Sequence, residues 1–144
     1  MPAPPSRDSF EYALIRVVPR VERGECLNAG VVLFCRPQRF LDARIDLDEA
    51  RLKALVPDLP VDELEAIREQ LALIPRIAAG DPTAGPIAKL TAPQRWHWLV
   101  APASTMIQPG PVHTGLTDNP AASLEHLYRT MVLIGNASES PAKS

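Results

Sequence analysis

The chain has 144 residues, of which 46% are hydrophobic and 22% are charged, and its formal net charge is -2. This composition is typical of a folded globular domain and excludes a largely disordered protein. The slight negative charge argues against a general nucleic-acid binder, which needs a basic surface to attract phosphates. The 16 prolines predict that the chain is divided into short elements.

The two ends of the chain differ from its middle. Residues 1–9 and 136–144 are rich in Pro, Ser and Ala, so we expect flexible tails around a single domain at residues 10–135. The chain shows no secretion signal and no apolar run of membrane-spanning length, which predicts a soluble, cytoplasmic protein. Cys26 and Cys35 lack the spacing of a metal or redox motif, so we expect no metal and no cofactor.

Two β-rich runs open the predicted domain. Phe10–Val18 and Leu27–Cys35 are dense in aromatic and β-branched residues, and a charged turn containing Gly24 joins them. This arrangement predicts an antiparallel hairpin. Apolar residues alternate again over Arg39–Ile45, which predicts a third strand that continues the hairpin as a meander.

Apolar residues at helical spacing predict two helices after the meander. Asp48 is a suitable N-cap for a short helix over Glu49–Val56. A longer helix should cover Val61–Ile77, where apolar residues repeat on one face, and Pro75 is expected to kink or end it. The apolar face of this helix should dock on the sheet.

The last third of the chain predicts further extended segments and a final helix. Arg95–Ala101 carries two tryptophans in a β-compatible run bounded by prolines, which predicts a strand with both rings on one face. Two prolines interrupt Thr105–Thr114, so we expect an irregular edge there. The final helix should begin after Asn119 and stop at 135–136.

Together these elements predict an α+β fold. The sheet should be mainly antiparallel, formed by the N-terminal hairpin and meander with later strands, and about three helices should pack on one face. Strands and helices do not alternate strictly along the chain, so a parallel sheet is not expected.

Polar residues of the opening hairpin form the first candidate binding group. Arg16 lies in the first strand and Arg23 in the turn, and a guanidinium group can bind a carboxylate or phosphate through two hydrogen bonds. The plainer interpretation is a solvated turn and a solvent-facing Arg16. Asn28 and Gly30 interrupt an apolar run. The plainer interpretation is a β-bulge or close packing at Gly30, with Asn28 bonding to the turn backbone, and the functional one is a backbone opening that admits a ligand or partner.

The second candidate group lies between Trp96 and Thr114. From it we assign Ser104, Gln108 and Thr114 to a candidate pocket. A serine nucleophile needs a base that an acid orients, and no spacing here marks such a triad, so hydrolysis is not expected. The two tryptophans could form a stacking platform, although packing beneath a helix is the more common role.

Several of these segments resemble one bacterial family, the domain of unknown function 3037 (DUF3037). The residues that carry the resemblance are Tyr12–Pro19, Arg23–Glu25, Asn28–Phe34, Trp98, Ser104–Thr105 and Leu124–Val132. The resemblance covers most of residues 10–134 and implies no established activity or catalytic residue. Members often lie beside genes for HipA-type kinases, so the resemblance implies a protein partner and a regulatory role towards such a kinase.

One function is therefore expected, with a second as its alternative. The first is a non-catalytic accessory or protein-interaction module, possessing a protein partner such as a HipA-type kinase and binding neither nucleic acid nor membrane. The second is a small enzyme or metabolite-binding protein, whose polar pocket would join the N-terminal hairpin to the 104–114 segment. The second function requires these two groups to converge in one concave site.

Overall fold

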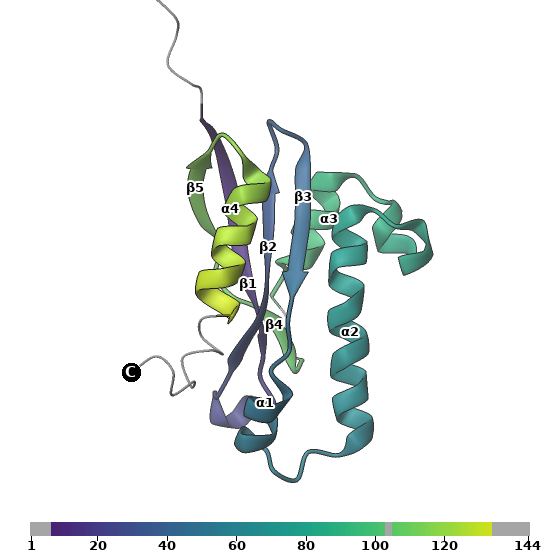
Figure 1. The fold of residues 1–144 in the computed structure, drawn as a ribbon. Helices are drawn as coiled ribbons and strands as arrows, with labels where there is room; N and C mark the ends of the chain where they lie inside the picture. Colours follow the sequence, from purple (N-terminus) through teal and green to yellow (C-terminus); the bar gives the residue numbers. More distant parts are fainter. Residues whose placement is uncertain (1–6, 103–104, 134–144) are drawn as a thin grey trace, which may run out of the picture.

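The computed structural model describes residues 7–102 and 105–133 (Figure 1). Its strands are β1 (Asp8–Val17), β2 (Leu27–Cys35), β3 (Phe40–Ile45), β4 (Ile107–Pro109) and β5 (His113–Thr117). Its α-helices are α1 (Glu49–Leu55), α2 (Val61–Ala79), α3 (Ala92–Leu99) and α4 (Pro120–Leu127), and α4 continues into a π-helical segment, η4 (Tyr128–Leu133). The α+β class is confirmed, with one helix more in this part of the chain than expected.

The described residues include the expected start of the domain at residue 10 but not its expected end at residue 135. β1 begins at Asp8, two residues before the expected start of the first strand. The predicted helix end at 135–136 and the predicted tail at 136–144 lie outside the described residues.

The strands form one antiparallel sheet with the order β3-β2-β1-β4. The predicted hairpin and meander are confirmed, because β1 pairs with β2 and β2 pairs with β3. On its other side β1 pairs with β4 near its carboxyl end and with β5 near its amino end. The β1–β2 register shifts after Ile15, which leaves Ala29 without a partner in β1 and forms the expected β-bulge beside Gly30.

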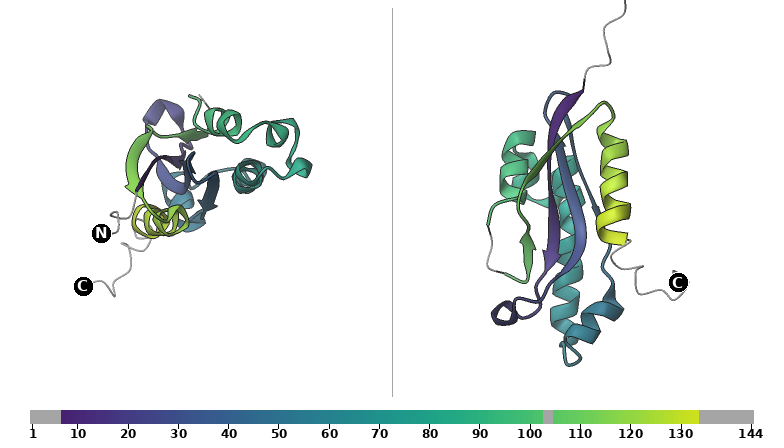
Figure 2. Two further views of the ribbon diagram at one scale, coloured as in Figure 1. Left: turned by 90° about the horizontal axis from the view of Figure 1, so that it is seen from above. Right: turned by 90° about the vertical axis from the view of Figure 1, so that its left-hand side faces the viewer.

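Helices cover both faces of this sheet, whereas the sequence pattern predicts helices on one face (Figure 2). On one face α2 and α3 pack over residues such as Ile15 and Val32. On the other face α4 packs through Leu124 over Val31 and Leu33. The reason is that β2 is buried along almost its whole length, so successive residues present apolar side chains to both faces.

The long helix α2 passes through Pro75 and ends at Ala79, so the expectation that this proline could end the helix is wrong. Proline in a helix interior removes a hydrogen bond and costs about 3 kcal/mol. Burial offsets that cost, because Leu71, Ile74 and Ile77 on the same face are all buried in the core. The helix ends instead at Gly80, which has the left-handed conformation (φ 76°) of a helix C-cap.

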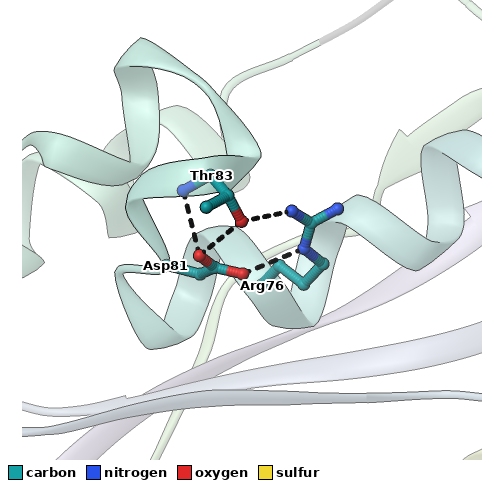
Figure 3. A network of polar contacts seen from close by, with 3 residues as sticks. All are labelled: Arg76, Asp81 and Thr83. Carbon is teal, nitrogen blue, oxygen red and sulfur yellow. Dashed lines mark hydrogen bonds and ion pairs between the residues drawn. The ribbon is translucent and has the colours of Figure 1, made fainter.

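Three polar side chains join the end of α2 to the turn that follows (Figure 3). Arg76 donates from Nε to Asp81 Oδ2 at 3.1 Å and from Nη2 to Thr83 Oγ1 at 2.7 Å. Thr83 donates to Asp81 Oδ1 from both its backbone amide and its hydroxyl. These hydrogen bonds lower the pKa of Asp81 to about 2. The Thr83 hydroxyl makes the largest contribution, followed by the Thr83 amide and then Arg76.

The segment predicted as a strand at Arg95–Ala101 is the helix α3, so this prediction is wrong. Thr91 caps the helix by accepting from the amide of Gln94, whose side chain accepts in turn from the amide of Thr91. The two tryptophans consequently lie in different environments. Trp96 is 2% exposed, with its ring centroid 5.7 Å from that of Phe34, while Trp98 is 49% exposed.

Candidate functional site

Three of the residues predicted for the binding group lie in one row across the sheet. Arg16 of β1 pairs with Asn28 of β2 on one side and with Gln108 of β4 on the other. Residues directly opposite each other in antiparallel strands share a face, and this is the face that α4 covers. The sheet therefore brings part of the N-terminal hairpin and part of the 104–114 segment together.

The two amides of this row have partners within the fold. Asn28 donates from Nδ2 to the carbonyl oxygen of Met131 at 3.0 Å, and Gln108 donates from Nε2 to that of Thr105 at 2.8 Å. Asn28 thus bonds to the last helical segment and not, as the plainer interpretation expects, to the turn backbone. Arg16 lies against Gly110, where a Cβ atom would be 3.0 Å from its Cζ.

Asn28 belongs to a set of contacts that fix α4 and η4 to the sheet. Arg44 of β3 forms an ion pair with Glu125, and its Cζ lies 4.4 Å from the ring centroid of Tyr128. Burial, followed by the nearby Asp46 carboxylate, raises the pKa of Tyr128. These contacts give the α4 face of the sheet a structural role.

The remaining hairpin residues of the predicted group do not join the row. Arg23 forms an exposed ion pair with Glu25, with 3.0 Å between Nη2 and Oε1, which fits a solvated turn. Gly30 pairs with Ile15, on the face that α2 covers. A Cβ atom at Gly30 would lie 2.3 Å from Cδ1 of Ile45, so close packing requires this glycine.

The other two predicted residues lie elsewhere in the chain. Thr114 pairs with Glu11 near the amino end of β1, away from Arg16. Ser104 lies outside the described residues. The structure therefore brings Arg16, Asn28 and Gln108 together and separates them from Arg23, Gly30 and Thr114.

Beside Trp98 there is an apolar groove of about 400 Å³ between α2, α3, β1 and β4. Sequence patterns did not indicate it, because α3 was predicted as a strand. Residues of all four elements form its walls. Its apolar lining residues include Ile15, Leu73, Ile74, Ile77, Trp98, Leu99, Ile107 and Pro109.

A second, more polar cavity of about 450 Å³ lies between α3 and the sheet, and we call it the polar cavity. Thr114, Glu11 and Phe34 line it as one row across β5, β1 and β2. Arg36 follows β2 directly, and His97 comes from α3. Thr114 belongs to the predicted binding group, but no sequence motif marked Glu11 or Arg36.

Three further findings concern the described residues. None of their His, Cys, Asp and Glu side chains gather in groups of three that could hold a metal ion. None of the helices among residues 7–102 and 105–133 has the length and apolar character needed to cross a membrane. Cys26 and Cys35 are both free thiols.

Comparison with known proteins assigns the chain to a family. The family model described as "Protein of unknown function (DUF3037)" matches residues 12–132. The chain belongs to the DUF3037 family. No curated protein and no solved structure gave a match. In this DUF3037 protein the family model covers every residue that lines the apolar groove. It also covers the residues that line the polar cavity, except Ser9, Phe10 and Glu11.

Proposed function

We propose that this DUF3037 protein is a non-catalytic accessory module that binds another protein, with a HipA-type kinase as the first partner to test. The observation that carries the proposal is the apolar groove with Trp98 at its edge. Trp98 is 49% exposed although its neighbour Leu99 is buried. Exposed apolar surface of this kind often marks a protein-binding site.

Tryptophan is well suited to anchor a partner. It supplies a large rigid apolar surface with few rotatable bonds, and it is enriched among the residues that dominate binding energy. Around Trp98 the groove is held by α2 and by β4, whose residue Ile107 pairs with Val17 in the sheet. A partner side chain would therefore enter a largely preformed groove, which lowers the entropy cost of binding.

The polar residues also support a binding module more than an enzyme. Arg23 is paired with Glu25, Asn28 holds Met131, and Arg44 is engaged with Glu125 and Tyr128. These groups, which a reaction could have used, contribute to the fold. Two free cysteines agree with a cytoplasmic location, where thiols stay reduced.

The proposal can be tested by purifying a tagged form of the protein co-produced with the HipA-type kinase of the same organism. Size-exclusion chromatography with light scattering should reveal a stoichiometric complex. Trp98→Ala should weaken binding by about 2 kcal/mol, roughly 30-fold, which is the effect of removing a central interface tryptophan. Val61→Ala is the matched control, because Val61 is 71% exposed and does not line the groove.

The possible results separate the function from the surface. If neither the kinase nor any other protein is recovered stoichiometrically, also by gentle purification from the native organism, the interaction function is contradicted. If a complex forms and Trp98→Ala binds as tightly as Val61→Ala, the function stands and the apolar groove is not the surface used.

A further inference from the structure

The polar cavity contains a carboxylate that differs from the other half-buried glutamates. In the described part of the chain these glutamates are Glu11, Glu25, Glu49, Glu63 and Glu125. Four of them form an ion pair with an arginine. The side chain of Glu11 forms no hydrogen bond or ion pair with any residue in 7–102 or 105–133.

The other polar side chains of the polar cavity are equally unpaired. Arg36, His97 and Thr114 make no side-chain hydrogen bond or ion pair among the described residues. Glu11 is half-buried, and a charge of that kind without a partner is unfavourable, while Arg36, His97 and Thr114 are exposed around it. Donors and acceptors that stay unused within the fold are available to a ligand.

The charges of the polar cavity indicate what kind of ligand would fit. Glu11 is directly opposite Phe34, and Arg36 is the first residue after β2, so an anion and a cation line the same cavity. No ion pair joins the two side chains. A small molecule with an ammonium and a carboxylate group would complement both charges.

The apolar part of the polar cavity adds a second requirement. Phe34 and Trp96 line it with their rings 5.7 Å apart and are almost completely buried, whereas Pro37 and Pro93 line it with accessible surface. The two prolines therefore supply apolar surface that a ligand can reach. A volume of about 450 Å³ lies in the range of small-molecule sites. The ligand should therefore have an apolar or aromatic body.

We propose that the polar cavity binds an α-amino acid with an apolar or aromatic side chain. Its ammonium group lies against the carboxylate of Glu11 and its carboxylate against the guanidinium of Arg36. The side chain packs against Pro37 and Pro93, and Thr114 and His97 offer further hydrogen bonds. This ligand site is separate from the apolar groove and does not depend on the proposed protein partner.

The probes are L-phenylalanine and two analogues that each lack one charge. Phenethylamine has no carboxylate, and N-acetyl-L-phenylalanine has no ammonium group. Calorimetric titration of the wild-type protein should show saturable binding of L-phenylalanine. Each analogue should bind about tenfold more weakly or worse, since a hydrogen-bonded charge contributes at least that factor.

Two variants assign the charges to residues. In Glu11→Gln, L-phenylalanine and N-acetyl-L-phenylalanine should bind equally weakly, because the partner of the ammonium group is gone. In Arg36→Gln, L-phenylalanine and phenethylamine should bind alike. Arg39→Gln is the matched control: Arg39 is an exposed arginine of the same turn that does not line the polar cavity. Circular dichroism would verify that each variant is folded.

Two results would overturn the inference. One is the absence of saturable binding for every apolar and aromatic amino acid at concentrations up to about 10 mM, which corresponds to a binding free energy weaker than about 3 kcal/mol. The other is binding that folded Glu11→Gln and Arg36→Gln leave unchanged. The inference and the proposed function can fail separately, because Trp98→Ala should retain amino-acid binding and Glu11→Gln should retain the protein partner.

Discussion

Gly30 is the residue whose replacement tests the packing of the sheet most directly. A Cβ atom there would lie 2.3 Å from Cδ1 of Ile45 and 2.8 Å from the carbonyl oxygen of Arg44. Because one of these contacts is backbone, Gly30→Ala cannot be relieved by a side-chain rotation alone. We expect the variant to lose about 1–3 kcal/mol of unfolding free energy, as other overpacked cores do, measured by urea denaturation.

Gly110→Ala is the control for this substitution. The Cβ atom there would meet the flexible end of Arg16 at 3.0 Å, which can move away at little cost. The loss of stability should therefore be clearly smaller than for Gly30→Ala. Equal midpoints for Gly30→Ala and the wild type would show that the close packing of β2 on β3 is wrong.

Asp81 should give the protein a measurable pH dependence. Its pKa of about 2 is below the ordinary value of 3.8 because Thr83 and Arg76 donate to the carboxylate. A lowered pKa in the folded state stabilises the protein above the ordinary pKa, and this contribution disappears as the pH falls from about 3.8 to about 2. The stability difference between the wild type and Asp81→Asn should therefore shrink over that window.

The pKa of Asp81 can also be followed by NMR titration. Thr83→Val should raise it, because the hydroxyl hydrogen bond is the largest cause of the shift. Thr130→Val, whose hydroxyl donates to the carbonyl oxygen of His126 far along the chain, should leave it unchanged. An unchanged titration in Thr83→Val would contradict the network of Figure 3.

At the scale of elements, Asn28 links β2 to the end of the last helix. Its side chain donates to the carbonyl oxygen of Met131 within the π-helical segment η4. Asn28→Ala should remove about 1 kcal/mol locally, since this is the usual net value of one hydrogen bond. Hydrogen exchange should then show the amides of η4 opening roughly fivefold more often.

Gln108→Ala is a suitable comparison for this experiment. Gln108 lies in the same row as Asn28, at the opposite end from it, and its side chain donates to the carbonyl oxygen of Thr105. Its removal should leave exchange in η4 unchanged. If both variants accelerate exchange equally, the effect comes from the sheet and not from the bond to Met131.

The helix α3 occupies a segment that its local sequence pattern predicts as a strand. The dense aromatic run from Trp96 to Trp98 favoured a strand, yet Thr91 and Gln94 stand three residues apart, as the ends of a capping box do. Hydrogen bonds at the cap and burial of Trp96 against Phe34 outweigh the weak β preference of the run. The capping spacing was the signal that could have identified the helix.

For the whole molecule, the sequence predicted the elements better than their placement. Local patterns of apolar periodicity and capping residues were enough to predict several elements. These are the hairpin, the meander, α2 and the cap of α4 by Asn119. The position of α4 on the second face depends on long-range pairing, because β1 and β2 are apolar on both sides and local periodicity does not choose between them.

The same limit applies to the candidate sites. Arg16, Asn28 and Gln108 could be selected as unusual polar residues in apolar surroundings, but only the register shows that they form one row. Glu11 and Arg36 look like ordinary exposed charges in the sequence. Glu11 stands out only because the other half-buried glutamates are paired with arginines, and those ion pairs can be known only from the folded structure.

The division of one side of β1 between β4 and β5 also bears on how the protein avoids aggregation. Each of these strands is short, and β4 contains Pro109, so neither offers a long row of free amides. At the opposite edge, the carboxylate of Asp42 accepts the amide of Ala43 at 2.8 Å. A strand from another copy would find this donor already occupied, so both edges of the sheet discourage copies from joining edge to edge.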